Sequence, residues 1–161
     1  MMGGQGGGAL GTLVDRKNRW TCLQRVHTKQ AEEVADNLIE GLKDHREKVH
    51  TLTVDRGTVF AQHEKVANAL KGDVYFAHPY CAWEHGLNEN TNGLLRPYFP
   101  KGTNFKIISD DKIRQVEKRI NQRPRKALGF RTPQEIFDEK DSDPPIVHLR
   151  VESTHHCALQ S

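Results

Sequence analysis

Two acidic residues are spaced as a site for divalent metal ions would require. Asp55 ends the alternating apolar segment HTLTVDRG, and Glu89 lies within WEHGLNENTNGLLRPYFP, with 33 residues between them. An Asp at a strand end and a Glu on a later helix suit phosphoryl transfer by two metal ions, because hard cations prefer oxygen ligands and both reacting oxygens must be neutralised. Such a site normally has three carboxylates, and the pattern supplies two. Taken alone, Asp55 before Arg-Gly is more typical of a turn.

The segment around Glu89 predicts a helix with one polar face. At about 100° per residue, a helix over 83–96 groups four polar residues on that face: His85, Glu89, Asn92 and Arg96. We expect this face to look over the strand end that bears Asp55. Glu89 would then share a metal ion with Asp55, while Asn92 and Arg96 contact phosphate oxygens. The alternative is an ordinary surface helix whose polar residues face water.

A basic segment follows nearer the C-terminus. Between Lys112 and Arg131 the sequence has eight Lys or Arg and one acid. Such a local excess is typical of a surface that binds the phosphate backbone of a nucleic acid. The candidate DNA-binding residues are Arg119, Arg123, Arg125 and Lys126. The alternatives are a solvated helix face and basic residues that favour the negative end of the helix dipole.

Hydrophobic periodicity predicts the elements that would position these residues. An initial hairpin is followed by alternating helices and strands, which indicates an α/β domain with a mixed sheet. The predicted strands cover 11–20, 21–28, 50–57 and 73–79, and the predicted helices cover 29–44, 59–70, 83–96 and 112–123.

The 161 residues allow one domain with a modest core. We expect a flexible Gly-rich start over 1–8, a catalytic-type core over 9–137, and an acidic, Pro-containing linker and tail over 138–161. No apolar run approaches the ~20 residues that span a bilayer, which predicts no membrane partner. The three cysteines form no C-x-x-C pair, and a cytoplasmic location fits them best.

Four segments together resemble a known family. GALGTLVDRKNRW, LTVDRG, NENTNGLLRPYFPKGT and NQRPRKALGFRTPQEIF are similar to the catalytic core of insertion sequence 30 family transposases, within the Asp-Asp-Glu transposases and retroviral-type integrases. The resemblance implies a ribonuclease H-like fold, with Asp55 and Glu89 as catalytic, metal-binding residues. It also implies Mg²⁺ or Mn²⁺ as a two-metal cofactor. The implied partners are DNA, as terminal repeats and target, and further copies of the chain.

The sequence departs from the family pattern at its start. The family's first catalytic Asp would precede the segment GALGTLVDR, and Asp15 matches a non-catalytic position on the next strand. We therefore expect an N-terminally truncated transposase that lacks the first strand of its sheet. In the family fold this strand lies between the second strand and the strand that carries Asp55, so its loss threatens folding as well as chemistry.

Two functions remain open. The first is DNA transposition by metal-dependent strand cleavage and transfer at insertion-sequence ends. The second is a catalytically inactive, DNA-binding or oligomerising remnant of such a transposase. The unmatched first Asp favours an inactive chain, because two remaining carboxylates would hold the metal ions poorly.

Overall fold

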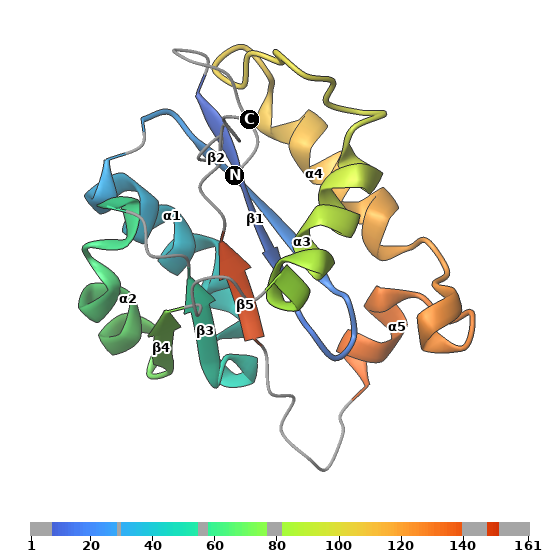
Figure 1. The fold of residues 1–161 in the computed structure, drawn as a ribbon, viewed down its shortest axis with the longest axis horizontal. Helices are drawn as coiled ribbons and strands as arrows, with labels where there is room; N and C mark the ends of the chain where they lie inside the picture. The colour runs from blue at the N-terminus through green and yellow to red at the C-terminus, as the bar shows by residue number, and fades with distance from the viewer. Residues whose placement is uncertain (1–7, 29, 55–57, 77–81, 140–147, 152–161) are drawn as a thin grey trace, which may run out of the picture.

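The computed structural model describes residues 8–28, 30–54, 58–76, 82–139 and 148–151. An antiparallel hairpin and a second, three-stranded sheet lie side by side, and helices cover the two faces (Figure 1). This is the mixed α/β arrangement that the sequence predicts.

The hairpin consists of β1 (Ala9–Val14) and β2 (Thr21–Val26). Ala9 pairs with Val26 at one end and Val14 with Thr21 at the other. A turn joins the strands, and across it the Asp15 N–H donates to the Trp20 carbonyl oxygen at 2.8 Å. Because side chains alternate between the faces of a strand, the hairpin supplies Leu13 to one core and Leu10 to the other.

The second sheet has the order β4-β3-β5, and all its strands are parallel. β3 (Thr51–Val54) lies between β4 (Asp73–Phe76) and β5 (His148–Val151). β5 also runs beside β1, so it occupies the place between the hairpin and β3 (Figure 1). The family resemblance assigns that place to the first strand.

The presence of β5 corrects the expectation of a tail throughout 138–161. Four residues of this range, 148–151, form a strand instead. The physical reason is tertiary: an unpaired edge of β3 exposes backbone donors and acceptors, and any extended segment within reach lowers that cost by pairing with it.

One face of the sheets is covered by α1 (Ala31–Leu42) and α2 (His63–Leu70). A 3₁₀ helix, Lys43–Lys48, continues α1, and another, Thr58–Phe60, precedes α2. The predicted helix over 59–70 is therefore two shorter pieces. The core on this side contains Val34, Leu38, Leu52, Val54, Val66 and Leu70.

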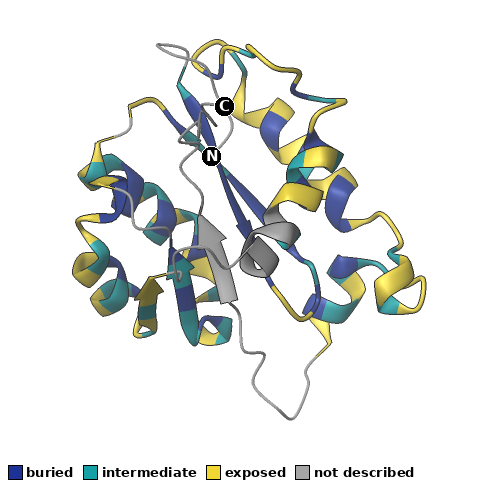
Figure 2. Cartoon of the chain, viewed as in Figure 1, coloured by how far each residue is buried: buried dark blue, intermediate teal, exposed yellow. Residues whose placement is uncertain are grey.

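The opposite face is covered by α3 (Ala82–Leu95) and α4 (Asp110–Asn121). Their core joins hairpin residues to both helices and contains Leu10, Leu23, Leu95, Phe99, Phe105, Ile113, Val116 and Ile120. Figure 2 shows that α4 has buried residues on one side and exposed residues on the other.

A short 3₁₀ helix (Lys126–Leu128) and α5 (Pro133–Asp138) follow α4. The sequence periodicity did not predict α5, because six residues are too few to show a period. Its local signals are nonetheless present: Thr132 and Glu135 form a reciprocal capping box around Pro133. Within the described ranges, no helix is long and apolar enough to cross a membrane.

Candidate nucleic-acid and metal site

Glu89 lies in the middle of α3 and is exposed. The helix is held on the sheet by its other side, where Leu95 is fully buried in the same core as Leu10. Thr91 is buried on this side as well, and its hydroxyl donates to the Leu87 carbonyl oxygen at 3.0 Å. Leu95 is therefore the residue that anchors α3 to the core. Glu89 and Arg96 are both exposed, Glu89 on the helix and Arg96 directly after its last residue.

Asn92 sits one turn after Glu89 and is half-buried. Its Oδ1 is enclosed and, among the described residues, has no hydrogen-bond partner. A buried carbonyl oxygen without a donor costs free energy, so this group calls for an explanation. Residues three apart on a helix are neighbours, which puts this free oxygen on the same side as the Glu89 carboxylate.

Asp55 lies outside the described residues, directly after the last residue of β3. That residue, Val54, is buried and pairs with Phe76 of β4 and Val151 of β5. In the sequence an acid follows each of two paired residues, Asp55 after Val54 and Glu152 after Val151. Glu152 also lies outside the described residues. Glu152 was not among the residues that the sequence analysis selected.

The side-chain oxygen atoms of the predicted site are of the kind that binds a hard cation. Within the part of the chain that the structure describes, no group of three or more His, Cys, Asp and Glu side chains is placed to hold a metal ion. The described members of the predicted site offer a carboxylate, on Glu89, and a free amide oxygen, on Asn92. Both are oxygen ligands, the class that Mg²⁺ and Mn²⁺ prefer.

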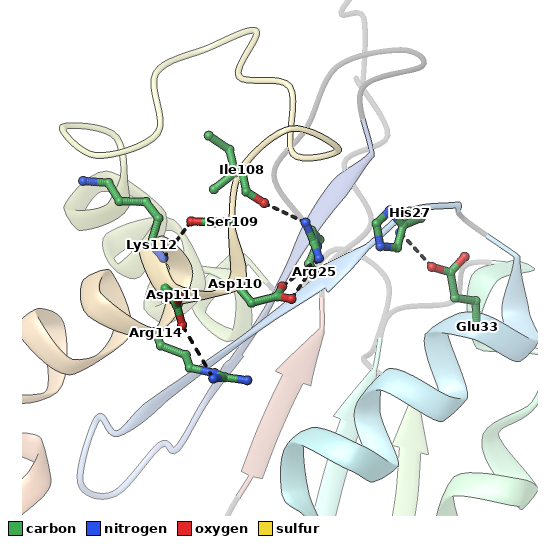
Figure 3. A network of polar contacts seen from close by, with 9 residues as sticks. All are labelled: Arg25, His27, Glu33, Ile108, Ser109, Asp110, Asp111, Lys112 and Arg114. Atoms are coloured by element: carbon green, nitrogen blue, oxygen red, sulfur yellow. Dashed lines mark hydrogen bonds and ion pairs between the residues drawn. The ribbon is translucent and has the colours of Figure 1, made fainter.

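The helix that carries the basic segment is fixed to the free edge of β2. At its start, Arg25 of β2 donates from Nη1 to the Ile108 carbonyl oxygen at 2.6 Å and from Nη2 to Asp110 Oδ2 at 2.9 Å (Figure 3). The Ser109 side chain caps the helix by accepting from the Lys112 N–H at 3.3 Å.

Two further side chains of α4 bind the same edge of β2. The Leu23 N–H donates to Glu117 Oε2 at 2.6 Å. Asn121 bonds both backbone groups of Thr21, accepting from its N–H at 2.8 Å and donating to its carbonyl oxygen at 2.7 Å. Burial raises the pKa of the Glu117 carboxyl above its ordinary value, although the Leu23 N–H and Arg114 act against that rise. This attachment gives α4 one orientation, with its basic side outward.

Three of the four candidate DNA-binding residues of the basic segment are open to solvent: Arg119, Arg123 and Lys126. Arg125 differs from the prediction of an outward phosphate contact. It is half-buried, and its Nη2 donates to the Ile120 carbonyl oxygen at 3.2 Å. Burial and the neighbouring Arg123 lower the pKa of the Arg125 guanidinium. Arg125 therefore ties the following loop to the end of α4.

Several curated proteins that match this sequence are transposases. The chain is 41% identical over 132 residues to the transposase for insertion sequence element IS4351 of Bacteroides fragilis, covering 82% of this chain and 40% of that protein. It is 40% identical over 130 residues to transposase InsI for element IS30A of Escherichia coli (strain K12), covering 80% of this chain and 34% of that protein. No protein-family model matches the chain.

A solved structure shows the same fold. A chain in the simian T-cell lymphotropic virus intasome, solved in complex with PP2A regulatory subunit B56 gamma, superimposes with a TM-score of 0.68 at 18% identity. The likeness covers 96% of this chain and 54% of that one, and it confirms the ribonuclease H-like, integrase-type fold. By sequence the chain belongs to the insertion sequence 30 family of transposases, and it spans about two fifths or less of the length of these curated relatives.

Proposed function

We propose that this chain supplies most of the catalytic core of an insertion-sequence transposase and that it binds DNA. The observation that carries the proposal is the coincidence of two independent likenesses. About 40% identity to transposases extends over four fifths of the chain, and the same residues adopt an integrase-type fold. The reaction class is cleavage and transfer of DNA strands at insertion-sequence ends.

Asp55 and Glu89 are the proposed catalytic pair, and they would hold Mg²⁺ or Mn²⁺. When bound, the metal supplies charge neutralisation at the reacting phosphate and activation of the attacking oxygen. The exposure of Glu89 on α3 supports this role. The Oδ1 of Asn92, one turn later on the same helix, has no partner among the described residues and is a further oxygen on that side. The proposed role of Arg96, which is exposed one turn further on, is to bind a phosphate oxygen next to the reacting one.

The proposed partners are the terminal repeats of an insertion sequence and the target DNA, met in the bacterial cytoplasm. Three exposed cations lie at and beyond the end of α4, Arg119 on the helix and Arg123 and Lys126 after it, and the attachment of Asn121 to β2 fixes the end of that helix. Phosphate contacts of this kind give affinity without sequence preference. We also propose that the chain assembles with further copies of itself on DNA.

A second candidate function is an inactive, DNA-binding or oligomerising remnant. The observation that favours it is β5, which takes the place beside β3 that the family fold gives to the strand bearing the first catalytic Asp. The DNA contacts are common to both candidates, and only the chemistry separates them.

Salt dependence of DNA binding tests the shared part of the proposal. Binding of the full chain to a labelled duplex is measured by fluorescence anisotropy at several salt concentrations. We expect affinity to fall steeply with salt, and replacing Arg119, Arg123 and Lys126 by Ala to make the log–log slope shallower by about 2 to 3, because each neutralised phosphate releases counterions.

A matched variant controls for net charge. Lys43, Arg46 and Lys71 are exposed on the α1–α2 side, and replacing them by Ala removes the same charge from the opposite layer. We expect this variant to keep the slope of the unaltered chain. Equal slopes for both triple variants would mean that the end of α4 is only a solvated face, and the DNA-binding proposal would be wrong.

A further inference from the structure

An exposed aromatic residue stands in the loop between α4 and α5. The Phe130 side chain is 72% exposed. Its backbone has φ +66°, in the left-handed region that a bulky residue rarely adopts, and it follows Gly129 in the same region at φ +63°. An unfavourable backbone and a large apolar side chain in water are two separate costs at one residue. An outlier of this kind is a reason to look for a function.

The loop is rigid enough to impose this conformation. The Phe130 N–H donates to the Arg125 carbonyl oxygen at 2.9 Å, and the Arg125 N–H donates to the Arg131 carbonyl oxygen at 2.9 Å. Arg131 is fixed in turn, because its guanidinium pairs with the Glu139 carboxylate through both Nη1 and Nη2. These bonds tie the two sides of the loop together, and the Phe130 ring is left at its surface.

The surroundings of Phe130 are basic. Arg123 and Lys126 are exposed on the same loop, and the sequence from Lys118 to Gln134 contains no Asp or Glu. The Glu139 carboxylate reaches this loop from the end of α5, where it is paired with Arg131 and so does not cancel the charges of Arg123 and Lys126. Charge complementarity therefore favours a polyanion as the partner of this surface. An exposed apolar ring on a loop that also carries cations is the combination that proteins use to bind single-stranded nucleic acids, because phosphates follow the cations and a base stacks on the ring.

We propose that Phe130 is a stacking platform for an unpaired base of DNA, with Arg123 and Lys126 binding the flanking phosphates. The inference rests on the proposed DNA-binding function and adds a class of ligand to it. A base inside a duplex has both faces covered by its neighbours, so the ligand is a single strand or an unpaired end. Stacking accepts any base, so this contact gives preference for strandedness without preference for sequence.

The test compares a labelled single strand with a duplex of the same sequence, using the full chain and fluorescence anisotropy over a range of salt. We expect Phe130→Ala to weaken single-strand binding about tenfold and to leave its salt slope unchanged, because stacking releases no counterions. Replacing Arg123 and Lys126 by Ala is expected to change the slope. Phe130→Trp is expected to keep full affinity, because an indole stacks at least as well as a phenyl ring.

Two controls separate stacking from loss of structure. Phe130→Asn removes the ring but suits a left-handed backbone, so we expect an unchanged or higher melting temperature together with weakened single-strand binding. Ile107→Ala removes another exposed apolar side chain, 79% exposed, from outside this loop, and we expect no effect on binding.

Several results would overturn the inference. Single-strand affinity unchanged in Phe130→Ala, while the Arg123 and Lys126 variant loses affinity, would leave the DNA-binding proposal standing and remove the stacking contact. Loss of self-association in Phe130→Ala, with DNA binding unchanged, would assign the ring to a protein contact instead. An absence of salt-dependent DNA binding by the unaltered chain would overturn the proposed function and this inference together.

Discussion

Asn121 and Thr21 are 100 residues apart in the sequence and are joined by two hydrogen bonds in the fold. The Asn121 side chain imitates a neighbouring strand, because its amide accepts from and donates to the backbone of Thr21 as a paired residue would. Both residues are buried. These two hydrogen bonds give partners to the backbone N–H and carbonyl of Thr21 at the edge of β2. They also fix the end of α4, after which the loop with Arg123 and Lys126 begins.

Removal of that amide is expected to destabilise the protein. Asn121→Ala leaves a buried N–H and a buried carbonyl of Thr21 without partners, which costs about 3 kcal/mol in free energy of unfolding. Urea denaturation followed by circular dichroism measures the change. Gln122→Ala, at the exposed next position, is the control, and we expect it to stay within about 0.5 kcal/mol of the unaltered chain. Equal midpoints for the two variants would show that the Asn121 bonds contribute nothing net.

The Glu117 carboxyl predicts a pH dependence of stability. Burial raises its folded-state pKa above the ordinary value of 4.5, so between these two values the folded state binds more protons than the unfolded state. The free energy of unfolding therefore falls as pH rises through this window, and the loss is complete above the folded pKa. We expect Glu117→Gln to be more stable than the unaltered chain at pH 7, with the difference vanishing below about pH 4, as measured by thermal melting across pH.

The pKa of Glu135 is shifted in the opposite direction from that of Glu117, so its effect on stability has the opposite pH dependence. Its pKa is lowered by the Thr132 backbone N–H and the Thr132 hydroxyl in the capping box, so its stabilisation is present at neutral pH and is lost as pH falls through the folded pKa. We expect Glu135→Gln to be less stable than the unaltered chain at pH 7. The same sign for both Gln variants would contradict the assignment of Glu117 to a desolvated site.

Proline in β5 tests the place of this strand in the sheet. Leu149 pairs with Leu52 in the middle of the β3–β5 ladder. Leu149→Pro fixes φ and removes a backbone N–H, and disruption of the short ladder is expected to cost about 2 kcal/mol. A chain ending after Val151 keeps the strand and serves as the control, with little change expected. If Leu149→Pro melts at the same temperature as the unaltered chain, β5 adds nothing to the stability of the sheet.

The 161-residue chain by itself is expected not to nick DNA. Two matched carboxylates, Asp55 and Glu89, are one short of the set that holds two metal ions. Conversion of supercoiled plasmid to the open circle, with Mg²⁺ or Mn²⁺, measures the activity. Nicking that is lost in Glu89→Gln and kept in Glu64→Gln, an exposed acid on α2, would contradict this prediction. Loss of that nicking in Glu152→Gln as well would identify Glu152 as the third carboxylate.

Local patterns in the sequence are sufficient for the regular elements around the site. Alternation of side chains predicts β3, and the three-to-four spacing of apolar residues predicts α1 and α4. The first strand is predicted over 11–20 and is observed over Ala9–Val14. The predictions of β3, α1 and α4 succeed because each depends on residues a few positions apart. The same locality groups Glu89 and Arg96 on one face of the helix, and both are exposed.

Local sequence patterns cannot predict contacts between distant segments. No local signal pairs His148–Val151 with β3, since a short apolar run becomes a strand only where a vacant sheet edge accepts it. The inward turn of Arg125 likewise depends on the free carbonyl of Ile120 at the end of α4. The sequence by itself determined the family, the local elements and the candidate residues. The tertiary structure decided which strand pairs with β3, which of the basic side chains face solvent, and that the Phe130 side chain is exposed. These outcomes depend on backbone groups that form hydrogen bonds with distant parts of the chain.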